Sequence, residues 1–546
     1  MQYDYIIVGA GSGGCSLASR LADECPDATI ALLEAGPHTE RNLFVNMPVG
    51  VAVVVPNKLK TNYGYETVPQ PGLAGRRGYQ PRGRGMGGSS AINAMVYTRG
   101  HPLDYDEWAQ LGCHGWSWND VLPYFRRAEG NERGADAWHG ADGPLTVSDL
   151  RFRNPFSERF VQAAQEAGHR LNTDFNGPDQ EGIGFYQVTQ RDGRRCSVAR
   201  AYVYDRARPN LHTLTDATAL RVTFEGKAAS GVEIVRGGRV ETLTARAEVI
   251  LAAGAFNSPQ LLMCSGIGPA AHLQSHGVRV IHDAPQVGQN LIDHIDFTIS
   301  KRVTSIEPTG FSVRGIARML PQFLTFTRHG KGMLSSNVAE AGGFLKSQPA
   351  LDRPDLQLHF CAALVDDHNR HLHWGHGYSL HVCVLRPHSR GTVTLASADA
   401  RTAPLIDPRF LSDARDLDLL VEGAHIARRI LDAPSLSMHG GEELYTRPGQ
   451  SEAELRATIA AHADTIYHPV ATCRMGSDAA SVVDPQLRVR GVTGLRIVDA
   501  SVMPTLIGGN TNAPTVMIGE RAAQFIAATR RGGVSAQPGV TAGAIV

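Results

Sequence analysis

The sequence predicts an α/β protein with an α+β second domain, in which the chain crosses between the two domains more than once. Two observations lead to this fold class. Residues 4–34 read in order as a strand, a glycine turn, a helix and a second strand, which is the order of a parallel βαβ unit. Residues 300–455 instead contain alternating strands, such as 355–360 and 391–395, a pattern typical of an antiparallel sheet with one buried face.

The bulk composition excludes several classes of protein. The chain has 546 residues, which is long enough for two or more domains. Its 53 basic residues are balanced by 53 acidic ones, so no nucleic-acid partner is expected. Eight cysteines are scattered without a CxxC pair, which fits reduced thiols in the cytoplasm better than a disulfide framework or a zinc site.

The apolar segments are short. Residues 1–9 lack a basic segment and carry too short an apolar run for a signal peptide. No window approaches the ~18 uninterrupted apolar residues of a transmembrane helix. We therefore expect a cytoplasmic protein that is either free or bound peripherally to the inner face of the cytoplasmic membrane.

The N-terminal unit is a complete dinucleotide-binding pattern. A strand at 4–8 leads into the glycines of a GxGxxG turn and a helix, and the strand at 29–33 ends on Glu34. The glycines allow the backbone to approach a pyrophosphate at the helix N-terminus, and the acid can take both ribose hydroxyls. This Rossmann-like motif does not choose between FAD and NAD, but Glu34 argues against a 2′-phosphate.

A second glycine turn lies within residues 81–100. It is a loop of backbone amides that leads into small residues. Because one pyrophosphate needs only one such loop, the second loop suggests a large flavin that is covered along its length. An ordinary Gly/Ser turn is the alternative.

A histidine and an asparagine on two separate turns are the candidate catalytic pair. Pro469 pushes His468 towards an extended backbone, so the histidine lies on a rigid turn. The second turn, 508–515, consists of small and amide residues and contains Asn512. Such a pair can serve as general base and hydrogen-bond donor to one substrate oxygen, although both turns can also be purely structural.

Five motifs in order resemble the glucose–methanol–choline (GMC) family of FAD-dependent oxidoreductases. Residues 81–100 and 254–268 resemble its first and second signatures, and residues 498–504 resemble a segment that contacts the flavin. Residues 465–476 resemble its catalytic His-Pro motif, and 510–515 its second catalytic motif. Together with the N-terminal unit, these matches span residues 4 to about 525.

The resemblance implies FAD rather than NAD. Some relatives attach the flavin covalently through a histidine of the first signature, but this chain has Ala91 and no histidine between Gly85 and Gly100, so we expect non-covalent FAD. The cofactor contacts carried over by the motifs are Gly9, Gly11, Ser12, Gly14, Glu34, Ala35, Arg84, Gly87, Gly88, Ser89, Asn93, Ala94, Met95, Val96, Val222, Gly254, Asp499, Ala500, Thr511 and Thr515.

The resemblance also implies a reaction. His468 would take the hydroxyl proton of an alcohol, Asn512 would hydrogen-bond the developing alkoxide, and a hydride would pass to flavin N5. The whole chain looks most like bacterial aliphatic alcohol dehydrogenases, which oxidise medium-chain primary alcohols and pass electrons to a quinone. The alternatives are a choline dehydrogenase, an alcohol oxidase that uses oxygen, a flavin-containing hydroxynitrile lyase and a flavoprotein without enzymatic activity.

The expected domain organisation follows from the same motifs. The FAD-binding domain is expected in three parts and the substrate domain in two, followed by a disordered tail. In chain order these segments are 1–153 (FAD), 154–193 (substrate), 194–300 (FAD), 301–455 (substrate), 456–530 (FAD, with the catalytic loops) and 531–546 (tail).

Three further segments allow two interpretations. Residues 313–331 form a basic amphipathic pattern that suits a membrane surface or an ordinary surface helix. Residues 49–56 can be a lid, but we favour a buried strand. The third segment holds four histidines, and because no cysteine or carboxylate spacing supports a metal there we predict none; they are His368, His371, His373 and His376.

Overall fold

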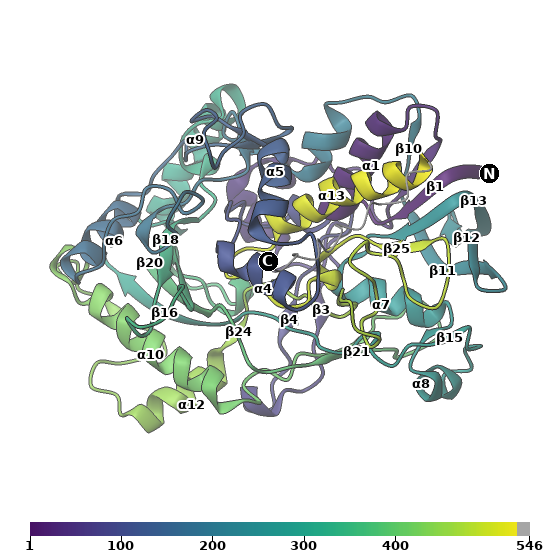
Figure 1. Cartoon of the computed structure of the whole chain (residues 1–546). Helices are drawn as coiled ribbons and strands as arrows, with labels where there is room; N and C mark the ends of the chain where they lie inside the picture. The colour runs from purple at the N-terminus through teal and green to yellow at the C-terminus, as the bar shows by residue number, and fades with distance from the viewer. Residues whose placement is uncertain (532–546) are drawn as a thin grey trace, which may run out of the picture.

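The computed structural model describes residues 1–531, and its two large sheets lie in separate halves of the molecule (Figure 1). The first has the order β10-β2-β1-β13-β12-β11, with β25 beside β13. Its strands are β1 (Gln2–Val8), β2 (Ile30–Leu33), β10 (Leu211–Leu214), β11 (Ala217–Glu225), β12 (Ala228–Arg236), β13 (Arg239–Leu251) and β25 (Leu495–Ile497). The predicted tail falls on residues outside those described, apart from Arg531.

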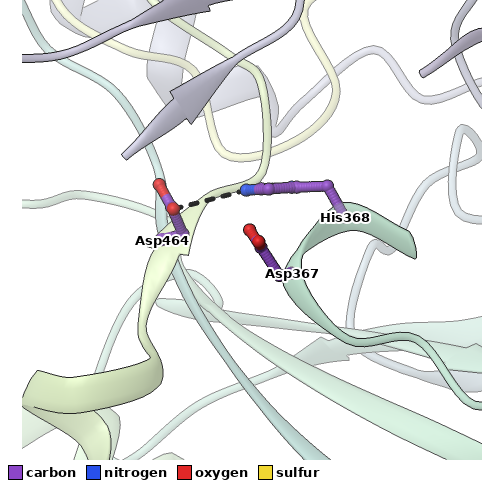
Figure 2. Close-up of side chains that lie close together, drawn as sticks. All are labelled: Asp367, His368 and Asp464. Atoms are coloured by element: carbon purple, nitrogen blue, oxygen red, sulfur yellow. Dashed lines mark ion pairs between the residues drawn. The ribbon is translucent and has the colours of Figure 1, made fainter. Parts of the chain in front are cut away.

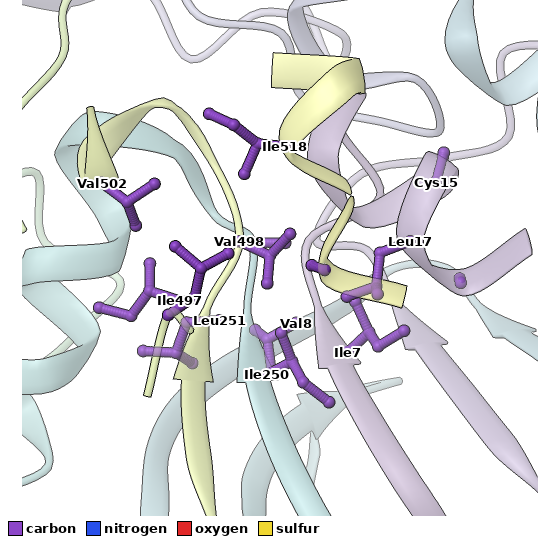
Figure 3. Close-up of a cluster of buried hydrophobic side chains, with 14 of the residues drawn as sticks. Ile7, Val8, Cys15, Leu17, Ile250, Leu251, Ile497, Val498, Val502 and Ile518 are labelled. Carbon is purple, nitrogen blue, oxygen red and sulfur yellow. The ribbon is translucent and has the colours of Figure 1, made fainter. Parts of the chain in front are cut away.

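The central strands of this sheet pair in parallel and are apolar on both faces, as parallel strands are when both faces of a sheet are covered. β1 pairs in parallel with β2 and β13, with Ile6 opposite Val249, and a strand buried on both faces reads as a continuous apolar run. Helices α1 (Ser12–Glu24) and α13 (Asn512–Arg530) run side by side over it. Figure 3 shows the core between helices and strands, to which Leu17 and Ile518 contribute from the helices.

The second sheet is antiparallel, with the order β23-β16-β20-β19-β18-β7, and β17 and β24 at its margins. Its core is formed against α6 (Pro155–Glu166) and α10 (Ala414–Leu431). Each strand therefore needs only one apolar face, which explains the alternation in the sequence. The strands are β7 (Gly182–Phe185), β16 (Ile295–Val303), β17 (Gly310–Phe311), β18 (Ala339–Leu345), β19 (Leu356–Cys361), β20 (Gly375–Val384), β23 (Glu442–Glu443) and β24 (Asp464–Thr465).

The chain crosses between the sheets as the sequence predicts. β7 lies in the expected segment 154–193, whereas β16 begins at Ile295, shortly before the expected boundary at 300. β24 lies within 456–530, directly before the His-Pro turn. The boundaries of the individual domains remain predictions.

Residues 49–54 are helical and 55–56 form a turn, so the expected buried strand at 49–56 is wrong. They form η1 (Pro48–Gly50) and α3 (Val51–Val54). The Asn62 side-chain amide donates to the carbonyls of Val54 and Val55, so tertiary contacts override the strand preference of the valines.

The helix expected at 313–331 is present as α9 (Val313–His329), and only Gly315 and Phe326 of its residues are buried. None of the helices in residues 1–531 is long and apolar enough to cross a membrane.

The remaining helical elements are α2 (Leu43–Asn46), η2 (Pro71–Leu73), η3 (Gly88–Ala91), α4 (Pro102–Gln110), α5 (Trp118–Ala128), η4 (Arg200–Tyr204), α7 (Gly254–Cys264), α8 (Ala270–Ser275), η5 (Met333–Ser335), η6 (Asp367–Asn369), α11 (Pro434–Ser437), α12 (Glu452–His462) and η7 (Ala500–Val502). The short strands are β3 (Tyr65–Glu66), β4 (Tyr79–Gln80), β5 (Glu129–Asn131), β6 (Leu145–Val147), β8 (Gln190–Arg191), β9 (Arg194–Arg195), β14 (Ile267–Gly268), β15 (His282–Asp283), β21 (Thr392–Thr394) and β22 (Leu405–Asp407).

Candidate active site

A cavity of about 1400 Å³ is lined by residues of both halves of the molecule. One part of its wall comes from the β1–α1 turn and the end of β2, and another from the His-Pro turn and β19. Pockets for single small ligands are usually ~300–1,000 Å³, so this cavity has room for a dinucleotide and a substrate together.

Three helix N-termini meet at the dinucleotide part of the cavity. The first residues of α1, α7 and α13 all line it, and unpaired amides at helix N-termini favour a pyrophosphate. A Cβ added at Gly11 would meet no protein atom within 4 Å, whereas one at Gly14 would lie 1.9 Å from the Gly9 carbonyl oxygen. Gly11 therefore leaves space for a ligand, and Gly14 allows α1 to pack closely on β1.

Glu34 lines the cavity and also holds its loops together. Its carboxylate accepts hydrogen bonds from three backbone amides, those of Ala10 (3.1 Å), Gly36 (2.9 Å) and Gly85 (2.8 Å). Burial raises the pKa of Glu34, and these amides oppose that shift. The acid thus connects the first glycine turn to the second.

Most of the predicted cofactor contacts line the cavity, and three do not. The residues of the first group are Gly9, Gly11, Ser12, Glu34, Ala35, Arg84, Gly88, Ser89, Asn93, Ala94, Met95, Val96, Gly254, Asp499, Ala500, Thr511 and Thr515. Gly14 and Gly87 lie behind this wall, where the Gly87 amide donates to the Ala10 carbonyl at 2.7 Å. Val222 lies further along β11 and its amide donates to Ser265, so the strand reaches the cavity through residues 217–219 instead.

The backbone around His468 is fixed by a buried carboxylate. Asp293 accepts the His468 amide at 2.8 Å and the Thr465 hydroxyl at 2.6 Å. Tyr467, with a φ of 77°, lies in the left-handed region, and its carbonyl accepts from Arg82 at 2.8 Å. Burial raises the pKa of Asp293 to about 6. The turn that carries the histidine is thus over-determined.

The hydrogen-bond network fixes the tautomer of His468. Burial lowers the pKa of His294 to about 3 and that of His468 well below its usual value, so both rings are neutral at pH 7. His294 Nε2 lies 3.0 Å from the Leu385 carbonyl and must donate to it. Its Nδ1 is then an acceptor for His468 Nδ1, 2.9 Å away. His468 Nε2 is left with its lone pair exposed towards the cavity.

The asparagine opposite this lone pair is Asn510, and not the expected Asn512. Asn510 Nδ2 lies 3.2 Å from His468 Nε2. Its Oδ1 accepts from Gln357 Nε2 at 3.1 Å, which turns the amide NH₂ group towards the histidine. Asn512 Oδ1 accepts from the Ser12 hydroxyl at 2.7 Å, so this residue connects α13 to the first glycine turn.

A third histidine, His359 on β19, was not identified from the sequence. Its side chain lines the cavity and is almost fully buried, and neither ring nitrogen has a partner at ordinary hydrogen-bond distance within residues 1–531, although the Asn510 side chain is near enough to oppose the lowering of the His359 pKa. Burial lowers its pKa to about 3, so it is neutral and available to a ligand. Alternation along the strand predicts which residues share a face with His359. Only the register of the sheet shows that this face lines the cavity.

Of the four histidines at 368–376, His368 alone belongs to a possible group of metal ligands in the described chain, with Asp367 and Asp464. Figure 2 shows these side chains pointing towards one another, with His368 Nε2 3.3 Å from Asp464. Arg370 pairs with Asp367 at 2.9 Å, and Arg76 lies 3.7 Å from Asp464. Since each carboxylate already has an arginine, ion pairs account for the cluster.

Comparison with known proteins places this arrangement in a family. The GMC oxidoreductase family models match residues 3–296 and 387–519. The chain is 49% identical over 531 residues to an alcohol dehydrogenase (acceptor) of Pseudomonas putida, covering 96% of both chains. It is 42% identical over 542 residues to the mitochondrial choline dehydrogenase of Homo sapiens, covering 96% of this chain and 90% of that one.

Solved structures agree. An FAD-dependent oxidoreductase from Chaetomium thermophilum superposes with a TM-score of 0.87 at 28% identity, covering 97% of this chain and 100% of that one. The glycine turns, the helix N-termini and the size of the cavity fit the cofactor named there. The chain therefore belongs to the GMC oxidoreductase family and is an FAD-dependent oxidoreductase.

Proposed function

We propose that this protein oxidises a primary alcohol to the aldehyde, with His468 as general base and Asn510 as hydrogen-bond donor to the alcohol oxygen. The observation that carries the proposal is the unprotonated Nε2 of His468, which faces the Asn510 amide across 3.2 Å at the cavity wall. FAD, when bound, supplies the hydride acceptor. The residues of the glycine turns and of the three helix N-termini would hold it without a covalent bond.

The chain's own part in the reaction is positioning and proton transfer. An alcohol hydroxyl between His468 and Asn510 replaces the bond that these residues make with each other. Its proton passes to Nε2, and the Asn510 amide donates to the oxygen as negative charge develops. Burial makes His468 a weak base, and the developing alkoxide beside the ring offsets this by favouring the imidazolium. His359 offers a further ring nitrogen to the same ligand.

Anaerobic mixing of the purified protein with 1-octanol, followed by loss of flavin absorbance, tests this assignment. We expect His468→Ala to slow flavin reduction by roughly 10²–10⁴-fold and Asn510→Ala by roughly 10²–10³-fold, each with FAD still bound. Asn512→Ala is the matched control and should weaken FAD retention more than the rate. A larger rate loss in Asn512→Ala than in Asn510→Ala would restore the pairing expected from the sequence.

The same experiment separates the alternative reactions. A hydroxynitrile lyase or a flavoprotein without activity would show no bleaching by any alcohol. Reoxidation by a soluble quinone analogue but not by oxygen supports the dehydrogenase that we propose, whereas rapid peroxide formation with oxygen supports an oxidase. If choline bleaches the flavin and 1-octanol does not, the choline dehydrogenase alternative replaces the aliphatic one.

We also propose a quinone-type acceptor and peripheral membrane contact, and the entrance of the cavity supports both. Eight hydrophobic side chains line the cavity and are at the same time solvent-exposed, an arrangement that marks an interaction surface. We call them the apolar collar; they are Leu43, Phe44, Val53, Leu59, Phe311, Ile316, Leu320 and Phe323. Two segments contribute to it, and they pack together through Met47 and Phe326.

The charges around the apolar collar suit an anionic lipid surface. Residues 41–60 and 308–339 contain no aspartate or glutamate, but they carry seven lysines and arginines. These are Arg41, Lys58, Lys60, Arg314, Arg318, Arg328 and Lys331. Basic residues beside an apolar face are typical of helices that lie in the membrane interface. A cavity that opens there can receive a lipid-dissolved alcohol and acceptor.

Sedimentation with vesicles tests the membrane proposal. Leu320, 70% exposed on α9, is replaced in Leu320→Glu, and Leu111→Glu changes a leucine that is 51% exposed but does not line the cavity. We expect binding to anionic vesicles that weakens in Leu320→Glu and persists in Leu111→Glu. Equal binding by both variants, or binding to neutral vesicles alone, would contradict a basic, lipid-facing collar.

A further inference from the structure

A buried ion pair lies at the cavity wall formed by the antiparallel sheet. His381 on β20 is the direct cross-strand partner of Thr298 on β16. Asp296 is two residues before Thr298 and shares its face of the sheet, so it lies close to His381. His381 Nδ1 lies 2.6 Å from Asp296 Oδ2 and 3.0 Å from the Thr298 hydroxyl. Burial lowers the pKa of His381, but the Asp296 charge outweighs this and raises it well above its usual value. The pair is thus an imidazolium with a carboxylate.

The two members of the pair face the cavity unequally. His381 lines the cavity wall and Asp296 does not. The Asp296 side chain is 8% exposed, and its Oδ1 has no hydrogen-bond partner within residues 1–531. The imidazolium therefore belongs to the cavity wall, whereas the carboxylate beside it lies outside the wall and still has a free acceptor atom.

The rest of the wall offers a cation no free carboxylate. In the described chain, the carboxylates that line the cavity are Glu34 and Asp499, and each accepts backbone amides at the dinucleotide part. Two of the lining aromatic rings already have a cation beside them, since the Arg82 guanidinium lies 5.1 Å from the Phe256 ring centre and that of Arg84 lies 5.9 Å from the Tyr63 ring centre. A quaternary ammonium group needs a carboxylate or an aromatic cage with free faces.

We propose that His381 determines substrate selectivity: by covering and neutralising Asp296, it makes the cavity reject cationic alcohols and accept uncharged ones. This inference rests on the proposed alcohol oxidation. It accounts for how a chain with relatives named alcohol dehydrogenase and choline dehydrogenase can favour the uncharged substrate. If the imidazolium is removed, the Asp296 charge is left facing a low-dielectric cavity, where it attracts a cation strongly.

Two alcohols of the same shape test this. Choline and neohexyl alcohol differ in that a quaternary nitrogen is replaced by a quaternary carbon. The ratio of their kcat/KM values is measured on FAD-loaded wild type, His381→Gln, Asp296→Asn and the double variant. We expect wild type to favour neohexyl alcohol by at least tenfold and His381→Gln to reduce that preference by at least tenfold, mainly through the KM for choline.

The double variant separates charge from packing. With Asp296 also neutralised, the preference should return to within about threefold of wild type, because no carboxylate is left to attract the cation. Asp296→Asn alone should keep rejecting choline, since burial then holds His381 neutral. An unchanged ratio in His381→Gln, or the same change in the double variant, would overturn the proposal.

If His381→Gln does not fold with bound flavin, the wild-type kcat/KM values for the two alcohols still test the proposal. Equal kcat/KM values for the two alcohols would refute the selectivity role while leaving alcohol oxidation intact. If wild type oxidises neither these alcohols nor 1-octanol, alcohol oxidation itself fails.

Discussion

His294 is the residue whose replacement tests the reasoning about the His468 tautomer most directly. Its ring makes two buried hydrogen bonds, to the Leu385 carbonyl at 3.0 Å and to His468 Nδ1 at 2.9 Å. His294→Ala leaves the Leu385 carbonyl and the His468 Nδ1–H group unpaired. His294→Asn keeps an acceptor oxygen near the position of the ring Nδ1.

The magnitudes follow from these two bonds. An unsatisfied buried polar group costs about 1–3 kcal/mol, so His294→Ala should lower the free energy of unfolding by roughly 2–6 kcal/mol. The bond that selects the tautomer contributes about 0.5–1.5 kcal/mol, or roughly 2- to 13-fold in the population with a free Nε2. We expect flavin reduction to slow by up to about tenfold in His294→Ala and by less in His294→Asn.

The assay is anaerobic flavin reduction at saturating alcohol, combined with urea unfolding of the same preparations. A tautomer effect appears as a lower limiting rate with KM little changed, because the substrate still fits the cavity. Equal rates in His294→Ala and His294→Asn would refute the argument, since only the asparagine retains an acceptor for His468. A large KM change with an unchanged limiting rate would assign His294 to packing.

Two further predictions concern pH and the glycine turn. His294 and His359 have pKa values lowered to about 3, so both stay neutral in the folded protein but take up protons below about pH 6.5 when the chain unfolds. Their contribution to the free energy of unfolding is therefore complete above about pH 6.5 and is lost as the pH falls towards 3. The loss amounts to up to about 1.4 kcal/mol per pH unit for each histidine. Asp293, with a pKa raised to about 6, and Glu34 and Glu340, whose pKa values burial also raises, oppose this loss. The lowered pKa of His468 adds to it, so urea unfolding at pH 7 and pH 5 should show the lower stability at pH 5; equal values would contradict the burial argument. Gly14→Ala should lower the yield of folded protein, because its Cβ would lie 1.9 Å from the Gly9 carbonyl oxygen. Gly11→Ala should fold but lose affinity for FAD, which is measured as the flavin released on dilution. Normal FAD affinity in Gly11→Ala would show that no ligand approaches Gly11.

The first sheet and the family could be predicted from the sequence because the features that indicate them are local. A strand, a glycine turn, a helix and an acid follow one another within residues 4–34, and each is recognised from its own neighbours. The prediction of a strand at 49–56 was wrong, because a run of valines favours a strand but contacts from Asn62 hold two helical turns there. Such contacts come from residues that the local pattern does not include.

The candidate pair shows the same limit at the level of single residues. Asn510 and Asn512 stand in one turn and have the same chemistry, so spacing cannot say which amide reaches His468. The start of α13 decides it: Asn512 begins the helix and bonds to Ser12, while Asn510 remains in the loop and is oriented by Gln357 from β19.

By itself, the sequence determined the class of the protein, its cofactor, the histidine and the turns on which the site is built, because these depend on residues that are adjacent in the chain. The tertiary structure decided which asparagine faces His468, which ring nitrogen is free, and that His381 covers Asp296. These depend on hydrogen bonds between strands and loops that are distant in sequence, such as the 2.9 Å bond from His468 to His294. Only the register of the sheet and the packing of the two halves fix such bonds.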